Sequence, residues 1–419
     1  MTVWSPTDNG YADLSSHDSF ENGAPHNTFA RLRHEDPVSW CEYKDGNGFW
    51  SVTRHEDIMA LNLDNAWMSS AQGIRMEDQT YEEYLARRTF QETDPPDHTR
   101  VRRLVAKAFS QPVVLQFENQ IRTLCDDILS KAFESKELDA VTHIARQLPM
   151  RMLGQIMGTP DEDLNWLVEK GDALMANSDS DFTSTVVDKM DTEAYRFMPF
   201  RSPAGLELYD YADRMMKNRK ATGAAKGILD LMLEPDADGN VISENEFKNF
   251  FCLLVAAGND TTRYSIAAGI HALANQQGLL NDLHTDPNIW ATLPDEVIRW
   301  ASPATYFRRT ATRDGELHGK TIRQGDKVLL WFASGNRDEI AFDNPNIVNF
   351  RRTPNRHLAF GQGGVHVCLG IWLARLEVRI VFQEIAKRVK SIEQMSPHAF
   401  VRSNFVGGIK RLPIRVSLN

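Results

Sequence analysis

One cysteine lies inside a glycine-rich stretch and directly before a predicted helix. The stretch FGQGGVHVCLG runs from Phe360 to Gly370, and three of the four residues after Phe360 are glycine. A helix N-terminus and its unpaired amides favour a thiolate and lower its pKa. Glycines also allow the backbone to approach a flat group closely. A thiolate held in this way at Cys368 is a nucleophile, a redox sensor or a metal ligand.

The surroundings of Cys368 favour the metal ligand among these three roles. No catalytic His/Asn signature accompanies the cysteine, and Phe360 can cover one side of it. Haem iron accepts one protein thiolate and keeps its other face open for oxygen. The loop therefore fits a metal ligand best, and haem iron is a metal that such a single thiolate can hold.

A second polar group interrupts the best-marked helix, which is predicted over residues 243–277. Ser243 and Glu246 form a capping-box pattern at its start, and the following residues are apolar almost all round, which predicts burial. In its middle stands AAGNDTTR, with Gly258, Asp260 and Thr261. Polar groups there are costly unless they are hydrogen-bonded or line a wet cavity. Taken alone, this pattern fits a Gly/Thr kink packed against a neighbour equally well.

Glu296 and Arg299 are a third candidate, in the predicted helix LPDEVIRWA (293–301). Their three-residue spacing puts both side chains on one helix face. An exposed pair of this kind is common and contributes little to stability. Alone, the pair indicates no function.

The elements that must position these residues are mostly helical. Little strand is expected, with 47–54 and 327–334 as examples, and further helices are expected at 98–109, 114–133 and 227–234. Residues 1–20 are expected to be a disordered tail, and residues 21–419 a single domain. The Ser/Asp-rich segment 170–205 fits a mobile lid over a pocket, or a surface loop with short helices.

Composition excludes several classes of function. A formal net charge of −10 and a pI near 5.7 argue against a general nucleic-acid binder. The N-terminal residues lack the basic and apolar regions of a signal peptide, and no run of 18 apolar residues could span a membrane. Four scattered cysteines with no CxxC pair disfavour zinc and disulfides and suit a cytoplasmic location.

Taken together and in this order, the motifs resemble the cytochrome P-450 superfamily, specifically the soluble bacterial haem-thiolate monooxygenases. The haem loop FGxGxHxCxG resembles FGQGGVHVCLG, the oxygen-activating motif (A/G)Gx(D/E)T is matched at 257–261, and ExxR is matched by Glu296 and Arg299. ETDPPDHTRVRRLV (92–105) and PNRHLAFG (354–361) resemble further family segments. In one departure, Phe360 stands eight residues before Cys368, one more than is common. A similarly longer loop is familiar from bacterial members that oxidise sterol side chains and branched lipids.

The resemblance implies a mainly α fold with small β-sheets, in which the haem lies between a long central helix and the Cys-bearing loop and helix. It implies heme b, with Cys368 as the metal ligand and Glu296–Arg299 as a structural pair. Asp260 and Thr261 are the implied catalytic residues that relay protons. The implied cofactor-binding residues are His98, Arg102, Gly258, Arg309, His357, Phe360, Gly364, Cys368 and Gly370.

By resemblance, mostly apolar residues surround the substrate and predict a terpenoid, a steroid or a fatty or branched lipid. These residues are Ile74, Val255, Ala256, Ala304, Phe307, Phe405 and Val406. The expected reaction is hydroxylation with O2, by a monomer. No flavin or iron–sulfur segment is visible, so electrons are expected from a separate ferredoxin and an NAD(P)H-dependent ferredoxin reductase. Arg100, Arg103 and Lys107 form a candidate ferredoxin-docking patch, or a solvated helix face.

Two other functions compete with this hypothesis. In a haem-thiolate sensor or haem-binding protein without turnover, Cys368 only anchors the haem. A peroxide-using relative usually replaces the acid–alcohol pair. Asp260 and Thr261 favour the monooxygenase over both, because neither alternative needs a proton relay.

Overall fold

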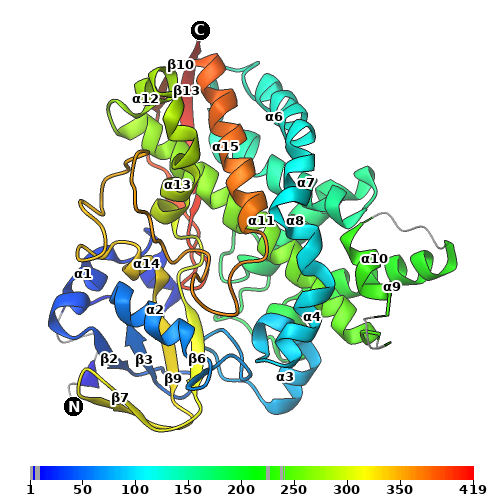
Figure 1. Cartoon of the computed structure of the whole chain (residues 1–419), viewed down its shortest axis with the longest axis vertical. Helices are drawn as coiled ribbons and strands as arrows, with labels where there is room; N and C mark the ends of the chain where they lie inside the picture. The colour runs from blue at the N-terminus through cyan, green and yellow to red at the C-terminus, as the bar shows by residue number, and fades with distance from the viewer. Residues whose placement is uncertain (1–2, 5–9, 223–226, 236–238, 240) are drawn as a thin grey trace.

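The computed structural model of the chain describes residues 3–4, 10–222, 227–235, 239 and 241–419. Helices make up most of the regular structure, and the strands form one mixed sheet and three small antiparallel sheets. In Figure 1 the mixed sheet lies at the lower left beside α1 (His26–Glu35), α2 (His55–Leu63) and α14 (Phe332–Gly335). Most of the other helices lie above and to the right of it, and the strands β10 (Val389–Gln394) and β13 (Pro413–Leu418) lie at the top. The architecture is the mainly α class that the sequence predicts. Within the described part of the chain, no helix combines the length and apolar character needed to cross a bilayer.

The mixed sheet has the strand order β1-β2-β3-β9-β6-β4. Its strands are β1 Val3–Trp4, β2 Val38–Cys41, β3 Phe49–Val52, β4 Met68–Ser69, β6 Phe307–Ala311 and β9 Lys327–Leu330. β3 and β9 pair in parallel at the centre, and all four residues of each are buried. Both predicted strands are therefore present, although the second ends at Leu330 and α14 (Phe332–Gly335) follows it.

The three small sheets lie outside the mixed sheet. β10 Val389–Gln394, β13 Pro413–Leu418 and β5 Glu137–Asp139 form the first. The hairpin of β7 Gly315–Leu317 and β8 Lys320–Ile322 forms the second. β11 Ala399–Phe400 pairs with β12 Ile409–Arg411 in the third.

The α-helices are numbered along the chain. Those before the central helix are α1 His26–Glu35, α2 His55–Leu63, α3 Tyr81–Arg87, α4 Asp97–Ala106, α5 Gln111–Val114, α6 Glu118–Ala132, α7 Gln147–Met157, α8 Leu164–Met175, α9 Pro203–Thr222 and α10 Ile228–Leu233. The central helix is α11 Glu244–Asn275, and the others after it are α12 Leu279–Thr285, α13 Leu293–Ala301 and α15 Ile371–Arg388. The predicted helices at 98–109, 114–133, 227–234 and 293–301 are all present, the first two with short 3-10 segments.

α11 is the longest helix and packs against α7, α8, α9, α13 and α15. Its predicted capping box is confirmed, because Ser243 Oγ accepts from the Glu246 amide and the Glu246 carboxylate accepts from the Ser243 amide at 2.8 Å. The helix continues without a break through Gly258. A Cβ on Gly258 would lie 2.4 Å from Leu153 Cδ2, so this glycine allows α7 to pack closely instead of producing a kink.

The N-terminal segment differs from the prediction of a disordered tail. Residues 1–2 and 5–9 of the predicted tail lie outside the described residues. Leu14 and Phe20 are buried, and the Phe20 ring stacks on Trp331 at 5.9 Å between centroids. The prediction is wrong for residues 10–20, because these apolar side chains have partners in the core that a local sequence pattern does not reveal.

The segment 170–205 contains the end of α8, two 3-10 helices (η7 Glu193–Tyr195 and η8 Pro199–Arg201) and the start of α9. Ser178 Oγ donates to the Arg402 carbonyl at 2.6 Å, and Asp179 accepts from the Arg402 amide at 2.9 Å. This arrangement agrees with a loop that carries short helices. A lid function of the segment stays a prediction.

Candidate active site

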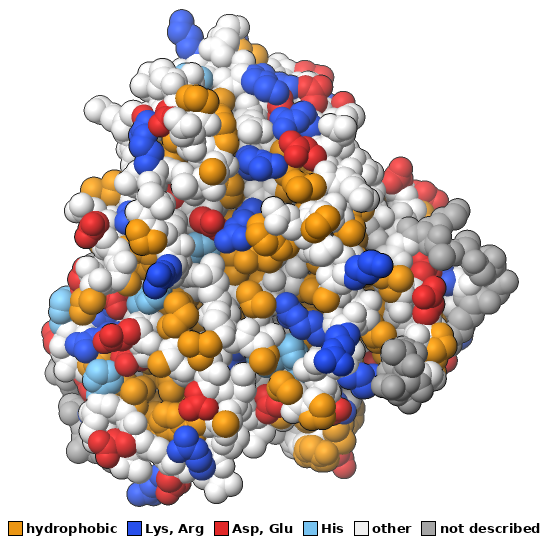
Figure 2. All heavy atoms as spheres, viewed as in Figure 1, with side chains coloured by type: hydrophobic (Ala, Val, Ile, Leu, Met, Phe, Trp, Pro, Cys, Tyr) orange, Lys and Arg blue, Asp and Glu red, His pale blue; other side chains and the backbone are white. Residues whose placement is uncertain are grey.

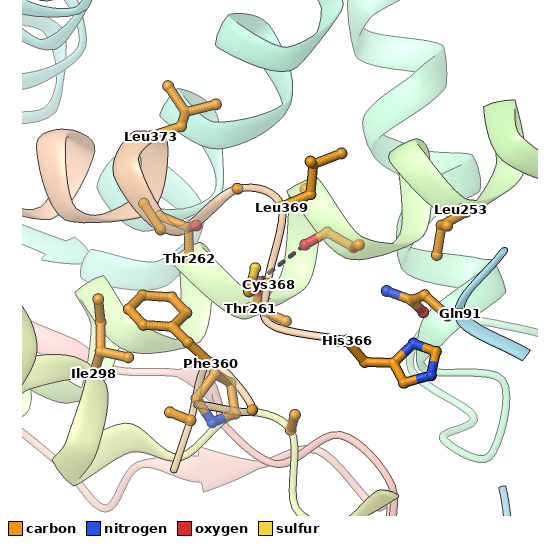
Figure 3. A pocket seen from close by; sticks show the side chains of 18 of the residues that line it. Gln91, Leu253, Thr261, Thr262, Ile298, Phe360, His366, Cys368, Leu369 and Leu373 are labelled. Carbon is orange, nitrogen blue, oxygen red and sulfur yellow. Dashed lines mark hydrogen bonds between the residues drawn. The ribbon is translucent and has the colours of Figure 1, made fainter. Parts of the chain in front are cut away.

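A mostly apolar cavity of about 200 Å³ lies between α11 and the glycine-rich stretch before α15. Cys368 stands in its wall, and Thr261 on α11 lines it as well. In Figure 3 these two residues overlap in the middle of the view, with Phe360 and Ile298 on one side and Gln91 and Leu253 on the other. The structure thus brings together the cysteine loop and the polar middle of the central helix, as the sequence predicts.

The cysteine loop is closed by a backbone hydrogen bond between its ends, in which the Cys368 amide donates to the Phe360 carbonyl at 2.8 Å. Gly361 and Gly363 have φ of +63° and +96°, a conformation that favours glycine. Gly364 lies against α2, where an added Cβ would stand 2.5 Å from the Asn62 carbonyl oxygen. These glycines let the backbone fold back so that Cys368 reaches the cavity.

The electrostatics of Cys368 differ from the prediction of a lowered thiol pKa. The Cys368 side chain is exposed at the wall of the cavity, where desolvation by the surrounding protein raises its pKa, although the Gly370 amide and the charges of Arg102 and Arg375 oppose this rise. α15 begins at Ile371, three residues beyond the cysteine, so the effect of the helix terminus does not dominate. A cation at the sulfur would reverse the balance, because a coordinating thiol is deprotonated.

Cationic and imidazole side chains gather around His366, which lines the cavity, whereas His98 and Arg102 lie behind it and do not line the cavity. Arg309 lines it, is buried, and donates to the Asn62 Oδ1 atom at 2.9 Å. The His98 and His366 rings lie 4.4 Å apart, and all four of their ring nitrogens are buried without a partner among the described residues. Arg102 donates to the Val367 carbonyl at 2.6 Å. Burial lowers the pKa of His98 to about 4, of His366 to about 2 and of Arg309 to about 10.

His366, which is not among the predicted cofactor-binding residues, lines the cavity and stands two residues before Cys368 within the quoted loop. His357, which was predicted in that role, has a different environment. Its Nε2 atom lies 3.1 Å from Asp295 Oδ1, and Arg375 donates to the same oxygen at 2.8 Å. His357 is fully buried beside Phe360 and does not line the cavity.

Glu296 and Arg299 form a buried pair in which the guanidinium donates to both carboxylate oxygens at 2.8 Å. Arg352 donates to Glu296 Oε2 at 2.9 Å, and Arg299 also donates to the carbonyls of Asn336 and Pro345. The pair therefore fastens α13 to the loop before the cysteine. Arg352 is the third member of this cluster, and the sequence alone did not assign it.

The wall of the cavity contributed by α11 follows a helical repeat. Its residues are Phe250, Leu253, Leu254, Ala257, Gly258, Thr261, Thr262 and Ser265. Thr261 Oγ1 donates to the Ala257 carbonyl at 2.9 Å. The same Oγ1 atom can still accept a hydrogen bond from a group in the cavity. Thr261 is therefore well placed for its predicted role.

Asp260 is buried one residue away from Thr261 but does not line the cavity. Its Oδ1 atom lies 2.8 Å from Arg263 Nη2, and Arg263 also pairs with Asp172 on α8. Burial raises the pKa of Asp260 to about 7, an effect that Arg263 opposes and the charge of Asp172 reinforces. A carboxyl with a pKa in this range can exchange a proton near neutral pH.

The predicted substrate residues divide into two groups. Ile74, Ala304 and Phe307 line the cavity, and Phe405 lines a neighbouring one. Val255, Ala256 and Val406 are buried and line neither cavity. Val255 and Ala256 are on another face of α11, where Val255 lies close to Gly171 of α8. A face of a helix that is apolar all round cannot be assigned from sequence alone.

Known proteins share this arrangement. The family described as Cytochrome P450 matches residues 293–406. Linalool 8-monooxygenase of Pseudomonas putida is 33% identical over 96% of this chain and 98% of its own length. This chain belongs to the cytochrome P450 family. A methyl-branched lipid omega-hydroxylase of Mycobacterium bovis is 33% identical, over 92% of this cytochrome P450 and 90% of the relative.

Solved structures agree with these sequence relationships. A cytochrome P450 of Mycobacterium marinum in complex with pseudoionone superposes on this one with a TM-score of 0.88 and 33% identity. The match covers 99% of this chain and 100% of the other. This cytochrome P450 is a haem-dependent monooxygenase, like the monooxygenases and hydroxylases that it resembles.

The residues of the cavity fit a haem. A porphyrin is flat and apolar with two carboxylates at one edge, and here an apolar cavity has buried donors at one edge. His98 and His366 have no other hydrogen-bond partner among the described residues. Arg309 and Arg102 would hold the same carboxylates by charge-assisted hydrogen bonds. Phe360 and Gly370 line the cavity beside Cys368, and Gly258 lines it from α11.

Proposed function

We propose that this cytochrome P450 hydroxylates a hydrophobic small molecule, of the terpenoid, steroid or branched-lipid class, with O2 and a heme b held by Cys368. Residues 21–419 would act as one haem-thiolate domain. The observation that carries the proposal is the apolar cavity in which Cys368 and the Thr261 hydroxyl both stand. A haem bound there supplies the redox chemistry that activates O2.

Within this function, the side chains of the chain have distinct tasks. Leu253, Ala304 and Phe307 would exclude water and bind the substrate body through apolar contact. The Thr261 hydroxyl would hold a water by accepting a hydrogen bond from it. Once its ion pair with Arg263 has opened and it has taken up a proton from solvent, Asp260 would pass that proton to the water. Arg102 and Arg309 would neutralise the haem carboxylates, and His98 and His366 would donate hydrogen bonds to them.

We further propose that electrons come from a separate ferredoxin and its NAD(P)H-dependent reductase, docking near α4. Figure 2 shows Lys and Arg side chains gathered on the face over α4. Arg103 and Lys107 are exposed there, and we call these two residues the α4 basic patch. Arg100, the third expected member, instead pairs with Glu246 at 2.6 Å.

The test uses the purified holoprotein. We expect its reduced CO adduct to show the thiolate-type Soret position, and Cys368→Ala to lose it. A terpene alcohol and a steroid, supplied with ferredoxin, reductase and 18O2, should give a product that carries one labelled oxygen. A thiolate-type spectrum without labelled product from any apolar substrate would favour the haem sensor over the monooxygenase.

A further inference from the structure

A second cavity of about 100 Å³ adjoins the one that holds Cys368 and differs from it in its charge. The two share Ile74, Gln91 and Leu253 in their walls, so they meet at these residues. In Figure 3, Gln91 and Leu253 lie on the side away from Phe360. We call the second cavity the polar chamber; its charged residues are Arg75, Glu77, Arg87, Glu92 and Arg201.

Arg75 is the central cation of the polar chamber. One terminal nitrogen, Nη2, pairs with Glu77 Oε1 at 2.8 Å, whereas Nε is buried without a partner among the described residues. The Phe200 and Phe405 rings lie 5.1 Å and 5.2 Å from the guanidinium carbon and hold it by cation–π contact. The guanidinium is therefore fixed in place while part of its donor edge remains unused.

The other two arginines of the polar chamber are held by several partners. Arg87 is held by Gln79 Oε1 at 2.8 Å and by the Arg196 carbonyl, and Nε of Arg201 is buried without a partner in the described part of the chain. Arg201 also pairs with Glu193 at 3.1 Å and lies 3.6 Å from Glu83, so it has counter-charges of its own. The unused donors of the polar chamber are therefore the Nε atoms of Arg75 and Arg201. A buried, incompletely paired arginine is costly unless an anion completes it.

The backbone beside the polar chamber is strained at two residues. Phe200 and Arg201 are both non-glycine residues at positive φ, +57° and +50°. Asn177 Nδ2 donates to the Phe200 carbonyl at 2.6 Å and helps to hold this turn. Strain of this kind persists where the surroundings fix a functional geometry. Here the turn places one residue that packs on Arg75 and one that lines the polar chamber with a free donor.

We infer that the substrate carries a carboxylate that binds Arg75 in the polar chamber, while its apolar body passes Ile74 and Leu253 into the cavity beside Cys368. The oxidised carbon then lies toward the end of the chain remote from the carboxylate. The inference rests on the proposed function, since it names the substrate class of the same site. Arg75 would determine specificity without touching the reacting atoms. The Glu77 carboxylate would compete with the substrate carboxylate for the Arg75 guanidinium.

The test compares hexadecanoic acid with hexadecan-1-ol, which share an apolar body and differ in charge. Dissociation constants of the holoprotein are measured by calorimetry and by the Soret shift, for wild type, Arg75→Met and Glu77→Gln. Arg415→Met is the matched control, because Arg415 is an ion-paired but half-exposed arginine on β13. Circular dichroism and haem content establish that each variant is folded.

We expect the wild type to bind the acid at least about tenfold more tightly than the alcohol, as for a buried charge-assisted hydrogen bond. Arg75→Met should abolish this preference by weakening the acid alone, and Glu77→Gln should strengthen the acid about threefold or more by freeing the guanidinium. Arg415→Met should match the wild type. The products of the acid should carry the new hydroxyl in the half of the chain near the methyl end.

Equal binding of acid and alcohol by wild type, or an unchanged preference in Arg75→Met, would overturn the inference and leave the proposed function standing. If Arg75→Met did not fold, a preference unaltered in Glu77→Gln would overturn it equally. Conversely, a carboxylate preference seen by calorimetry and lost in Arg75→Met, without any hydroxylated product, would support the polar chamber while the monooxygenase proposal failed.

Discussion

Arg263 Nη2 lies 2.8 Å from Asp260 Oδ1, three residues earlier on α11, and this ion pair holds the carboxyl away from the cavity that Thr261 lines. Asp172 on α8 pairs with Arg263 as well and accepts from Asn259 Nδ2 at 2.7 Å. Proton transfer from Asp260 thus requires this pair to open. The middle of α11 combines a fixed hydroxyl with a carboxyl that is buried and paired.

Asp260 should impose a pH dependence on stability. Burial raises its pKa to about 7, so between about pH 4 and pH 7 the folded state binds more protons at this group than the unfolded state. Its contribution to the free energy of unfolding therefore falls as the pH rises through this window. Asp260→Asn should lack that contribution, so the wild-type minus variant difference from urea denaturation should decline from pH 4 to pH 7. A difference independent of pH would contradict the raised pKa.

Thr261→Ala should separate electron consumption from product formation. Without the hydroxyl, a water near the Thr261 position loses its fixed partner, so we expect substrate binding to persist while most reducing equivalents appear as peroxide or water. The measurement is product formed per NAD(P)H consumed. Thr261→Ser restores the oxygen and should recover most of the coupling. Wild-type coupling in the alanine variant would remove Thr261 from the proton path.

Glu296→Gln should destabilise the protein severely. Glu296 accepts from Arg299 and Arg352, and all three are buried, so the amide would leave two cations without their common counter-charge. We expect a loss of about 3–5 kcal/mol in the free energy of unfolding, measured by urea denaturation of the holoprotein. Arg352→Met should cost less, because the two bonds between Arg299 and Glu296 remain. Equal losses in both variants would show that the three charges are not organised around Glu296.

Gly258→Ala should test the contact between α7 and α11. The added methyl would lie 2.4 Å from Leu153 Cδ2, and overpacking of this kind costs about 1–3 kcal/mol. Adding Leu153→Ala removes the colliding atoms, so the double variant should be more stable than the sum of the two single losses predicts. The measure is a double-mutant cycle by urea denaturation, and strict additivity would contradict a direct collision.

The α4 basic patch should govern the rate at which the ferredoxin associates. Neutralising Arg103 and Lys107 with glutamine should raise the ferredoxin concentration for half-maximal turnover several-fold and flatten its salt dependence. Arg100→Gln should have a smaller effect, because Arg100 is paired with Glu246. Peroxide-driven turnover, which needs no ferredoxin, is the control. Unchanged ferredoxin kinetics across a salt series would place the docking site elsewhere.

The sequence predicted those features whose signals are local. The capping box of α11, the buried helix and the cysteine loop each depend on residues close together in the chain, and all three are present. It could not predict that Asp260 pairs with Arg263 while Arg263 joins α8, because that geometry depends on helix packing. The side of α11 that faces the cavity could not be chosen either, since apolar residues surround the helix.

The hydrogen bond from the Cys368 amide to the Phe360 carbonyl also bears on how the loop between these two residues can change in length. This bond fixes both ends of the loop, and Asn62 Nδ2 donates to the Gly361 and Gln362 carbonyls at 3.0 Å and 3.3 Å. We therefore expect an extra residue between the two ends to alter the backbone between Gln362 and Val367 first, because the bond at the ends ties Cys368 to Phe360 in either case.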